Sequence, residues 1–454
     1  MNTKALRQKI LDLAIHGKLV PQDPNDEPAS MLLERIKAEK ERLIKEGKIK
    51  RTKRSKAACD KPHYPYELPK GWAWTTLGDL FVLQAGKNIT AKDIFTEQSE
   101  QHNYPCFGGN GIRGYVTNSN RNGEFPIIGR QGALCGNINL AIGEFYATEH
   151  AVVVERFSDT DLMWAYYTLI ELNLNQYATA TAQPGIAVNV INDVPIPVPP
   201  LKEQCRISKV VKLLFSLVDN IEQRKIDIQA TIKQGKSKIL DLAIHGKLVP
   251  QDPTDEPASE LLKRINPNAE IACDNPHYRN LPFQIPSTWA WCSHNDVLEI
   301  SGGSQPAKRF FSSVPQKGYV RLYQIRDYGE NPIPVYIPIE YAMKQTEEGD
   351  ILLARYGGSL GKVFHAKKGA YNVAMAKVIF KDKDLINKEY AYFYYLSDLY
   401  QGRLKEISRT AQAGFNSSDF NEMYFPLPPY EEQQRIVNAI NKAFTTLNAI
   451  AENL

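Results

Sequence analysis

A long stripe of apolar residues runs through the middle of the sequence. From Ile207 to Leu242, steps of four and three residues give eleven positions, and nine of them are apolar. A spacing of 3.5 residues keeps one stripe on one side of a helix, and the stripe stays dry only against another helix. The pattern therefore predicts a helix over about 201 to 245 that needs an equally long partner.

The partner helix is predicted from both ends of the chain. The same spacing starts again at Ile436 and continues through Ile440, Ala443, Leu447, Ile450 and Leu454. Subtracting 229 from positions 235, 239 and 242 gives Leu6, Ile10 and Leu13, so the first turns would complete the helix that the last turns begin. We expect an antiparallel pair of long coiled-coil helices with pseudo-twofold symmetry, about 65 Å long at about 1.5 Å per residue.

The offset of 229 comes from a direct repeat. Residues 9–36 return as residues 238–265 with three differences in 28 positions, namely Asn25/Thr254, Met31/Glu260 and Glu34/Lys263. At the same offset, PPLKEQCRI from Pro199 corresponds to PPYEEQQRI from Pro428. The chain therefore carries two copies of one structural unit in a circularly permuted order.

Each repeat predicts a helix, a turn and a second helix. Gly17 and Gly246 suit the left-handed residue that closes a helix, with a histidine before each one facing the carbonyl end of the helix dipole. We expect Asp26 and Pro28 to cap a short second helix that ends near Ile36. The near-identity of the polar turn suggests two matching docking surfaces, and recent duplication without selection is the alternative.

Two dissimilar regions lie between the repeated parts. They share GWAW and TWAW, an Arg-x-Gly pattern at Arg130 and Arg355, and TAQPG and TAQAG from Thr181 and Thr410. Short apolar runs between Gly and Asn clusters predict strands in mixed domains, so the expected class is α/β (α+β). The predicted limits are 1–64, 65–198, 199–277, 278–427 and 428–454. Similar frames that hold different domains favour the reading of two different ligands at a fixed separation.

Charge is distributed unevenly over a chain whose formal net charge is +4. Residues 66–198 hold 7 Lys/Arg and 13 Asp/Glu, whereas residues 278–427 hold 18 and 15. Residues 37–56 carry ten Lys/Arg against three Glu, a basic arm that could follow a phosphate backbone or form a solvated helix and linker. An acidic first domain would need a local basic patch to bind DNA.

Several classes of site are disfavoured by the sequence. The six cysteines include no CxxC pair, which argues against a disulfide framework or a structural zinc site, and we expect no metal and no cofactor. LPPY at Leu427, GGSLGK at Gly357 and FGGNG at Phe107 depart from methyltransferase and nucleotide-binding motifs, and FGGNG follows no buried strand in our interpretation. No signal-peptide or membrane-spanning run is visible, so the expected location is cytoplasmic.

The repeat, the PPLxEQxRI helix start and the TAQPGI segment resemble the DNA-specificity subunits of type I restriction-modification systems over the whole length. The resemblance implies a non-catalytic subunit in which each recognition domain reads one half of a split, asymmetric double-stranded DNA site. It also implies that the helices hold two methyltransferase subunits, with R subunits added in the restriction complex. The candidate contacts to the methyltransferase are Leu19, Pro21, Asp23, Leu248, Pro250 and Asp252.

The candidate DNA contacts are Lys, Arg, Asn, Gln and Tyr residues near Gly-rich loops, because arginine and lysine read guanine edges whereas asparagine and glutamine read adenine edges. They are Lys87, Asn88, Lys92, Asn110, Arg113, Arg121, Arg130, Gln131, Gln183, Lys308, Arg309, Arg321, Arg326, Arg355, Tyr356, Lys362 and Gln412. The shared position of Arg130 and Arg355 also fits a common structural role. Two alternatives stay open, a self-contained methyltransferase or nuclease and a scaffold that binds no DNA.

Overall fold

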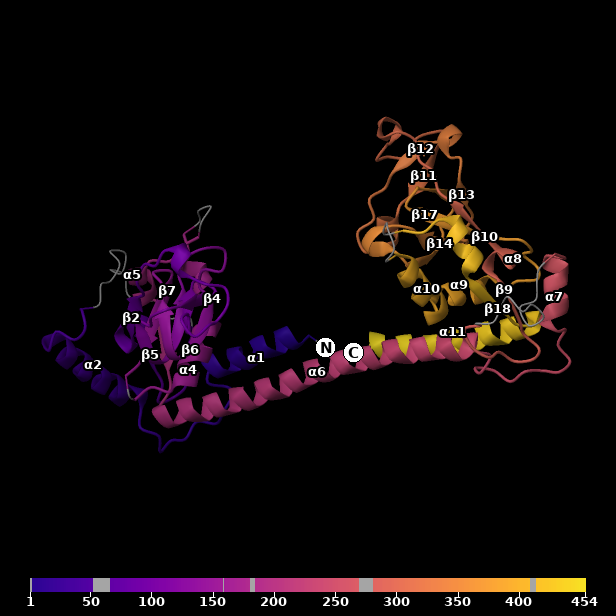
Figure 1. Ribbon diagram of the computed structural model, residues 1–454. Helices are drawn as coiled ribbons and strands as arrows, with labels where there is room; N and C mark the ends of the chain where they lie inside the picture. The colour runs from indigo at the N-terminus through magenta and orange to yellow at the C-terminus, as the bar shows by residue number, and fades with distance from the viewer. Residues whose placement is uncertain (1, 52–65, 158, 180–183, 269–280, 409–413) are drawn as a thin grey trace. The chain divides into compact units, whose positions relative to one another are not determined.

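A single long helix, α6, runs from Leu201 to Ile244 and confirms the helix predicted from the apolar stripe (Figure 1). The computed structural model describes residues 2–51, 66–157, 159–179, 184–268, 281–408 and 414–454. These residues form two compact units, and the division falls inside α6 between Arg224 and Lys225. The predicted domain limits differ from this division and stay a prediction.

The first unit combines one mixed sheet with flanking helices. The sheet has six strands in the order β2-β7-β5-β6-β3-β4, in which β3 and β6 run parallel and the other neighbours antiparallel. The elements are α1 (Thr3–Ile15), α2 (Ala29–Lys45), β1 (Ala73–Thr76), α3 (Leu77–Leu80), β2 (Val82–Ala85), β3 (Tyr104–Gly108), β4 (Gly111–Val116), β5 (Arg121–Gly129), β6 (Ile138–Ala147), β7 (Ala151–Glu155), α4 (Leu162–Glu171), α5 (Val188–Asn192) and β8 (Pro195–Val198).

The second unit has two four-stranded sheets, in the orders β10-β17-β14-β15 and β12-β11-β16-β13. Its elements are α7 (Ala258–Ile265), β9 (Ala290–Ser293), α8 (His294–Val297), β10 (Leu298–Gly302), β11 (Tyr319–Tyr323), β12 (Tyr336–Pro338), β13 (Gln345–Thr346), β14 (Ile351–Ala354), β15 (Val363–His365), β16 (Gly369–Tyr371), β17 (Met375–Phe380), α9 (Lys388–Leu396), α10 (Asp398–Ser408), β18 (Tyr424–Leu427) and α11 (Tyr430–Glu452). The mixed α/β class predicted from the sequence is confirmed.

Both units tie their domain to the helices through the same two-stranded ribbon. Strand β1 pairs antiparallel with β8, from Ala73 opposite Val198, and β9 pairs with β18 from Ala290 opposite Leu427. Three strands beyond the ribbon also correspond, because β2-β7-β5 and β10-β17-β14 follow the same order. The domains therefore share a central fold, as the sparse sequence skeleton predicted, and differ outside it.

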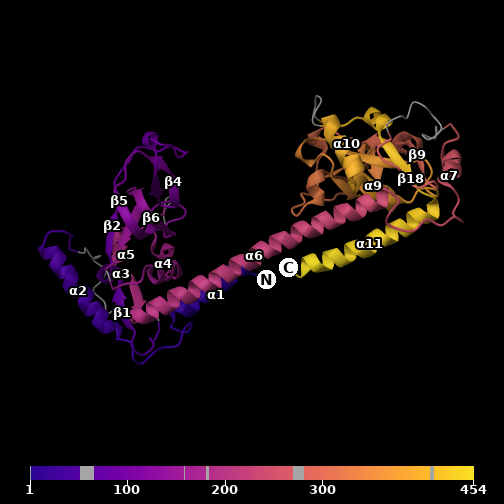
Figure 2. The same cartoon turned by 60° about the horizontal axis from the view of Figure 1, so that its bottom comes forward.

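Each part of α6 packs against a helix from one end of the chain, as both views show (Figure 2). In the first unit, Arg7 of α1 pairs with Asp219 at 2.5 Å and Glu222 at 2.9 Å. In the second unit, Lys236 binds Asn448 near the end of α11, while the start of α11 bonds to the turn that follows α6. Each pair is thus antiparallel. That α1 and α11 act together as one second helix stays a prediction.

The apolar stripe is buried unevenly along α6. Val211 and Val218 are buried in the first unit and Ile232 is buried in the second, whereas Ile221 and Ile228 are each 39% exposed. Burial of apolar side chains is the main stabilising contribution of such a helix pair, so the outer turns of α6 contribute more than its middle.

The prediction for the second helix of the repeat was wrong in two respects. Helix α2 continues to Lys45 instead of ending at Ile36, whereas α7 does end at Ile265. Asp26 does not cap the helix, since its carboxylate is buried and accepts a hydrogen bond from Arg206 at 2.6 Å. A buried carboxylate requires a cationic or hydrogen-bonding partner, and Arg206 supplies it.

The basic arm proves to be partly structural. Its first turns belong to α2, and the side chain of Lys40 is buried, where its ammonium group donates to the backbone oxygens of Gly78 and Phe81. Lys40 therefore holds α2 against α3. Residues 52–56 of the arm lie outside the described residues.

The cysteines behave as packing residues where the structure describes them. Cys106, Cys135 and Cys292 are free and buried, and Cys205 is free and half-buried. Burial raises the pKa of the Cys106 thiol to about 11, which keeps it protonated at neutral pH. Cys59 and Cys273 lie outside the described residues. Among the helices that the structure describes, none is long and apolar enough to cross a membrane.

A fully buried histidine distinguishes the two domains. In the second domain, His294 lies between the amide oxygen of Asn295, 2.9 Å from Nδ1, and the hydroxyl of Tyr395, 2.6 Å from Nε2. Leu77 begins the corresponding helix of the first domain. Burial lowers the pKa of His294 to about 4 from 6.5, since the charged ring would lose its hydration.

His294 should make the second unit acid-sensitive. Its folded-state pKa lies below the unfolded value, so the stability that the neutral ring provides is present above pH 6.5 and is lost as pH falls toward 4. The loss should approach roughly 3 kcal/mol. Thermal unfolding between pH 7 and pH 4 should show this fall in wild type and a weaker fall in His294→Leu, which carries the residue of the first domain. Equal pH dependence in both proteins would contradict this assignment.

Candidate functional site

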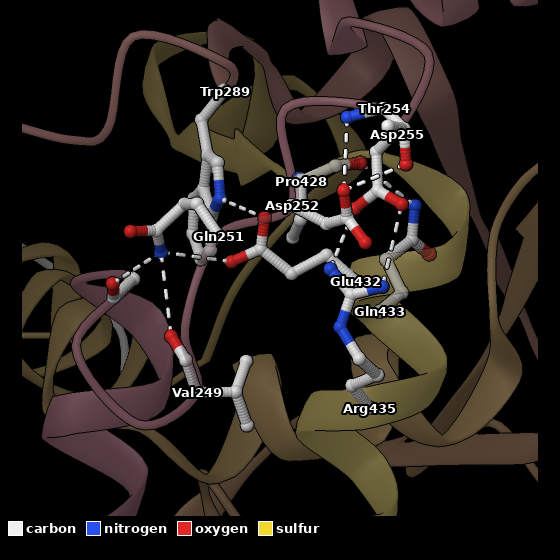
Figure 3. Close-up of polar contacts among 11 residues, drawn as sticks. Val249, Gln251, Asp252, Thr254, Asp255, Trp289, Pro428, Glu432, Gln433 and Arg435 are labelled. Atoms are coloured by element: carbon white, nitrogen blue, oxygen red, sulfur yellow. Dashed lines mark hydrogen bonds and ion pairs between the residues drawn. The ribbon is translucent and has the colours of Figure 1, made fainter.

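A buried carboxylate connects the helices to the domain in each unit. Glu432, at the start of α11, accepts hydrogen bonds from Trp289 Nε1 at 3.0 Å and Gln251 Nε2 at 3.1 Å (Figure 3). Glu203 of α6 makes the same bonds to Trp72 at 3.1 Å and Gln22 at 3.2 Å. Burial raises the pKa of both carboxyl groups, and these hydrogen bonds oppose the rise.

The other polar residues of the PPxxEQxRI motif make equally specific bonds. Gln433 donates to Pro428 O at 3.1 Å, and Arg435 donates to Asp255 at 2.5 Å (Figure 3). Gln433 also accepts from Asn387 N at 2.8 Å. The first unit repeats all three contacts with Gln204, Pro199, Asp161, Arg206 and Asp26. The motif is therefore a structural joint, here called the frame joint, that fastens the helix start to the turn and the domain.

The six residues predicted to contact a methyltransferase have different surroundings. Leu19 and Leu248 are half-buried against the domain cores. Asp23 and Asp252 each accept the backbone N–H two residues later at 2.9 Å, which shapes the turn. Pro21 and Pro250 are exposed and free to meet another molecule.

The first domain gathers three of the predicted DNA contacts at one hollow. A pocket of about 490 Å³ is lined by Asn110, Arg113, Gln131 and His150, together with Gly109, Gly132, Pro184 and Gly185. Gln131 forms a bridge with Gly185, so the Arg-x-Gly loop and the segment after the TAQ motif form one wall. Gly129 faces the backbone oxygen of Gly109 so closely that an added Cβ would lie 1.8 Å away, and only glycine fits there.

The four polar side chains of this pocket comprise three residues named from the sequence and one that was missed. Asn110, Arg113 and Gln131 were predicted, whereas His150 was not, because it lies in a segment without a recognisable pattern. The pocket offers guanidinium, amide and imidazole groups, which are the groups that hydrogen-bond to base edges.

The second domain has the same bridge and, beside it, a pocket lined by other side chains. Tyr356 bridges Gly414 as Gln131 bridges Gly185. A pocket of about 540 Å³ beside it brings together the predicted residues Arg326, Tyr356 and Lys362 with Tyr328, Ser359 and Phe364, which the sequence did not indicate. The two domains thus present the same backbone arrangement with different chemistry.

The backbones of Arg130 and Arg355 make corresponding hydrogen bonds in the two domains, and a shared role of their side chains stays a prediction. The backbone N–H of Arg130 donates to His150 O at 3.0 Å, and that of Arg355 donates to Ala374 O at 2.9 Å. The guanidinium group of Arg355 also donates to Phe415 O at 3.4 Å and lies 5.0 Å from the ring centroid of Tyr356. These arginines position the loops that line the hollows.

Some of the remaining predicted DNA contacts are bonded within their own domain, and others are exposed. Arg121 donates to Gln84 at 2.8 Å, and Arg321 pairs with the buried Asp327 at 3.0 Å, so both are held within their own domains. Lys87, Asn88, Lys92, Lys308 and Arg309 are exposed. Gln183 and Gln412 lie outside the described residues.

The reason given for excluding FGGNG as a nucleotide-binding loop was wrong. Phe107 and Gly108 end β3, and both are buried, so the motif does follow a partly buried strand. The exclusion rests instead on the next element, since the loop leads into strand β4 and offers no helix N-terminus to a phosphate.

The chain matches one family model and relatives that carry the same kind of description. A family model for the type I restriction modification DNA specificity domain matches residues 69–230 and 286–454. The EcoprrI specificity subunit of Escherichia coli is 45% identical over 148 residues, 33% of this chain and 37% of that protein. The EcoAI specificity subunit of Escherichia coli is 30% identical over 388 residues, 68% of this chain and 65% of that protein. The matches thus span less than two thirds of either relative.

A solved structure supports the fold alone. A chain described in work on complex assembly and conformational transition of the type I R-M system matches with a TM-score of 0.55 and 17% identity. The match covers 86% of this chain and 94% of that chain.

The frame joint predicts a specific stability effect. Trp289→Phe removes the indole donor from the buried Glu432, so urea unfolding of the second unit should show a loss of about 1–3 kcal/mol. Trp291→Phe is the matched control, because Trp291 is equally buried and its indole donates only to Phe283 O at 3.3 Å. A loss that is no larger in Trp289→Phe than in the control would argue against the joint.

Proposed function

The chain belongs to the type I restriction modification DNA specificity family, and from that premise we propose that it is the specificity subunit of a type I restriction-modification complex. Each domain reads one half of a bipartite, asymmetric double-stranded DNA site, and partner subunits methylate or cut the DNA. The observation that carries this proposal is the pair of matching bridges, each beside a polar hollow, with Gln131 in the first domain and Tyr356 in the second.

The chemistry of the hollows fits the reading of base edges. Phosphate contacts fix the register of a protein on DNA, whereas sequence is read by hydrogen bonds and apolar contacts to bases. The first hollow offers Asn110, Arg113 and Gln131, and the second offers Arg326, Lys362 and the ring of Tyr356. Different donors on one backbone arrangement suit two different half-sites.

Phosphate contacts are unequal in the two domains. In the acidic first domain the exposed Lys87 and Lys92 contact phosphates, and in the second domain the exposed Lys308 and Arg309 do so. Because residues 66–198 hold only 7 Lys/Arg against 13 Asp/Glu, partner subunits supply much of the phosphate binding around the first half-site.

The repeat supports two equivalent docking surfaces for methyltransferase subunits. Residues 9–36 and 238–265 match at 25 of 28 positions, whereas residues 199–225 and 428–454, at the same offset, match at only 8 of 27. Uniform recent duplication does not account for this difference between adjacent stretches. The identical residues include side chains exposed in both copies, namely Lys18, Pro21 and Pro24 with their counterparts Lys247, Pro250 and Pro253. Packing places no constraint on such positions. Contact with one kind of partner at each copy therefore explains why the residues are identical.

The helices serve as the spacer in this proposal. A stiff α6 with its two packed helices fixes the distance between the half-sites, and the R subunits join through the methyltransferases. Two alternatives have distinct outcomes. A self-contained methyltransferase or nuclease would turn over in the absence of partners, and a scaffold would give no DNA binding even with the methyltransferase present.

Replacement of the second domain tests the proposal directly. Residues 281–427 are exchanged for the corresponding segment of a relative, and the methylated sites of the reconstituted complex are sequenced. We expect one half of the target to change and the other half to persist, since each domain has its own hollow and its own frame joint. Simultaneous change of both halves would show that the domains do not read independently.

Charge reversal at the repeat tests the docking surfaces. Lys18→Glu should abolish binding of one methyltransferase subunit and leave one bound, Lys247→Glu should give the same stoichiometry, and the double variant should bind none. Both lysines are exposed, so thermal unfolding of the isolated chain should stay unchanged. Native mass spectrometry of the assembled complex measures the outcome, and full binding of two subunits by the double variant would exclude this surface.

A further inference from the structure

The loop before one central strand carries unpartnered polar atoms in both domains. In the first domain this loop is residues 148–150, before β7, and in the second it is residues 372–374, before β17; we call them the pre-strand loops. Among the described residues, the buried atoms without a hydrogen-bond partner include His150 Nδ1 and Glu149 Oε2 in the first loop. They also include Asn372 Oδ1 in the second loop and Ser304 Oγ beside it.

The two loops are structurally equivalent. Ala151 N donates to Thr148 O at 3.0 Å, and Met375 N donates to Asn372 O at 3.1 Å. A glycine at the end of the neighbouring strand donates to the first residue after each loop at 2.9 Å, Gly86 to Ala151 O and Gly303 to Met375 O. Unpartnered atoms therefore occur in the corresponding loop of two divergent domains, on its last two residues in the first domain and on its first residue in the second.

Close backbone approach holds each loop in place. A Cβ added at Gly86 would lie 2.1 Å from Ala147 O, and one added at Gly303 would lie 2.1 Å from Asn372 O. The backbone N–H groups of Arg130 and Arg355 hold the far end of the loops. The loops are therefore rigidly positioned, while Glu149 Oε2, His150 Nδ1 and Asn372 Oδ1 lack partners among the described residues.

Both loops offer a hydrogen-bond acceptor. Glu149 lies 3.1 Å from His150 Nε2, so this nitrogen holds the ring proton in the neutral imidazole and Nδ1 is left as an acceptor. Asn372 is 8% exposed, and its carboxamide offers Oδ1 as an acceptor. A buried polar group without a partner costs free energy, so a ligand donor at either place would be favourable.

We propose that His150 and Asn372 are specificity-determining residues, each accepting a hydrogen bond from the exocyclic amino group of an adenine or cytosine in its own half-site. The inference rests on the proposed function and extends it to two residues outside the sequence-based candidates. In the major groove these amino groups are the donors that bases present. His150 already lines the first hollow beside Gln131 and Asn110, whereas Asn372, 8% exposed, would need a side-chain rotation to present its acceptor to a base.

The carboxamide of Asn372 has a donor next to its acceptor, whereas the neutral imidazole of His150 has none on that side. Asn372 also carries the Nδ2 donor, so it can pair with both N6 and N7 of an adenine, whereas neutral His150 offers only its acceptor on that side. We therefore assign Asn372 to an adenine and His150 to an adenine or cytosine.

The experiment uses the full chain assembled with its methyltransferase and a DNA library with both half-sites randomised. His150→Ala should relax preference at one base position of the first half-site, and Asn372→Ala at one position of the second, by roughly tenfold or more. The preference at every other position should persist. His150→Gln, which retains an acceptor, should keep more of the preference than His150→Ala.

Matched controls separate base reading from the mere removal of an unpartnered group. Thr160 Oγ1 in the first unit and Tyr400 OH in the second are also buried and unpartnered among the described residues, but both lie away from the pre-strand loops. Thr160→Val and Tyr400→Phe should leave both half-sites unchanged. In each variant the half-site of the unaltered domain reports that the complex has assembled.

Each outcome has a definite meaning. Loss of preference at one position in the variant's own half-site supports the inference. Unchanged preference, or equal weakening at all positions, overturns it. If a variant domain fails to fold, its whole half-site is lost, and His150→Gln and Asn372→Ser then decide: a partial loss confined to one position supports the inference, and no change at any position overturns it. A wild-type complex without preference in either half-site would instead refute the proposed function.

Discussion

Each unit depends on one buried carboxylate with both oxygens bonded. In Glu203 and Glu432, one oxygen accepts the indole N–H of a domain tryptophan and the other accepts the amide of a turn glutamine. A buried carboxylate without such partners would be strongly destabilising, so helix start, turn and domain must assemble together. This constraint explains why the motif PPxxEQxRI occurs twice in a chain whose adjacent helix residues differ.

The frame joint fixes some parts of each unit and leaves other parts of the domain free to vary. The joint requires the tryptophan, the ribbon strands and the helix start, and it places no demand on the far side of the domain sheet. The first domain builds a six-stranded sheet there, and the second builds two four-stranded sheets and adds α10. The bridges at Gln131 and Tyr356 belong to the shared part of the domains, but the side chains around them differ, so their chemistry can diverge without loss of the joint.

Much of the fold could be predicted because its periodicities are strong. The 3.5-residue spacing gave the length of α6 to within a few residues, and the repeat located Gly17 and Gly246, which both adopt a φ of 65°. The length of α2 was missed because the repeat ends at Ile36 while helix-favouring residues continue past it. The role of Asp26 was missed because its partner, Arg206, is 180 residues away and only the fold brings them together.

The candidate site was less accessible to sequence reasoning. Asn110, Arg113 and Gln131 were found through their Gly-rich surroundings, and the structure gathers them at one hollow. His150 and Asn372 could not be found, because the pre-strand loops share no residue pattern and correspond only through backbone hydrogen bonds. Arg121 and Arg321 were selected by residue type, yet neighbouring side chains in their own domains hold both of them.

The central claim is that two equivalent frames hold two independent readers, and a chain with the same domain in both frames tests it most directly. Residues Trp72–Val198 would be replaced by a second copy of Trp289–Leu427, which keeps both tryptophans and both ribbon ends. Sequencing of the sites methylated by the reconstituted complex should reveal a palindromic target, with the second half-site present in both orientations. Methylation of the original asymmetric site, or of a site containing the first half-site, would contradict the account.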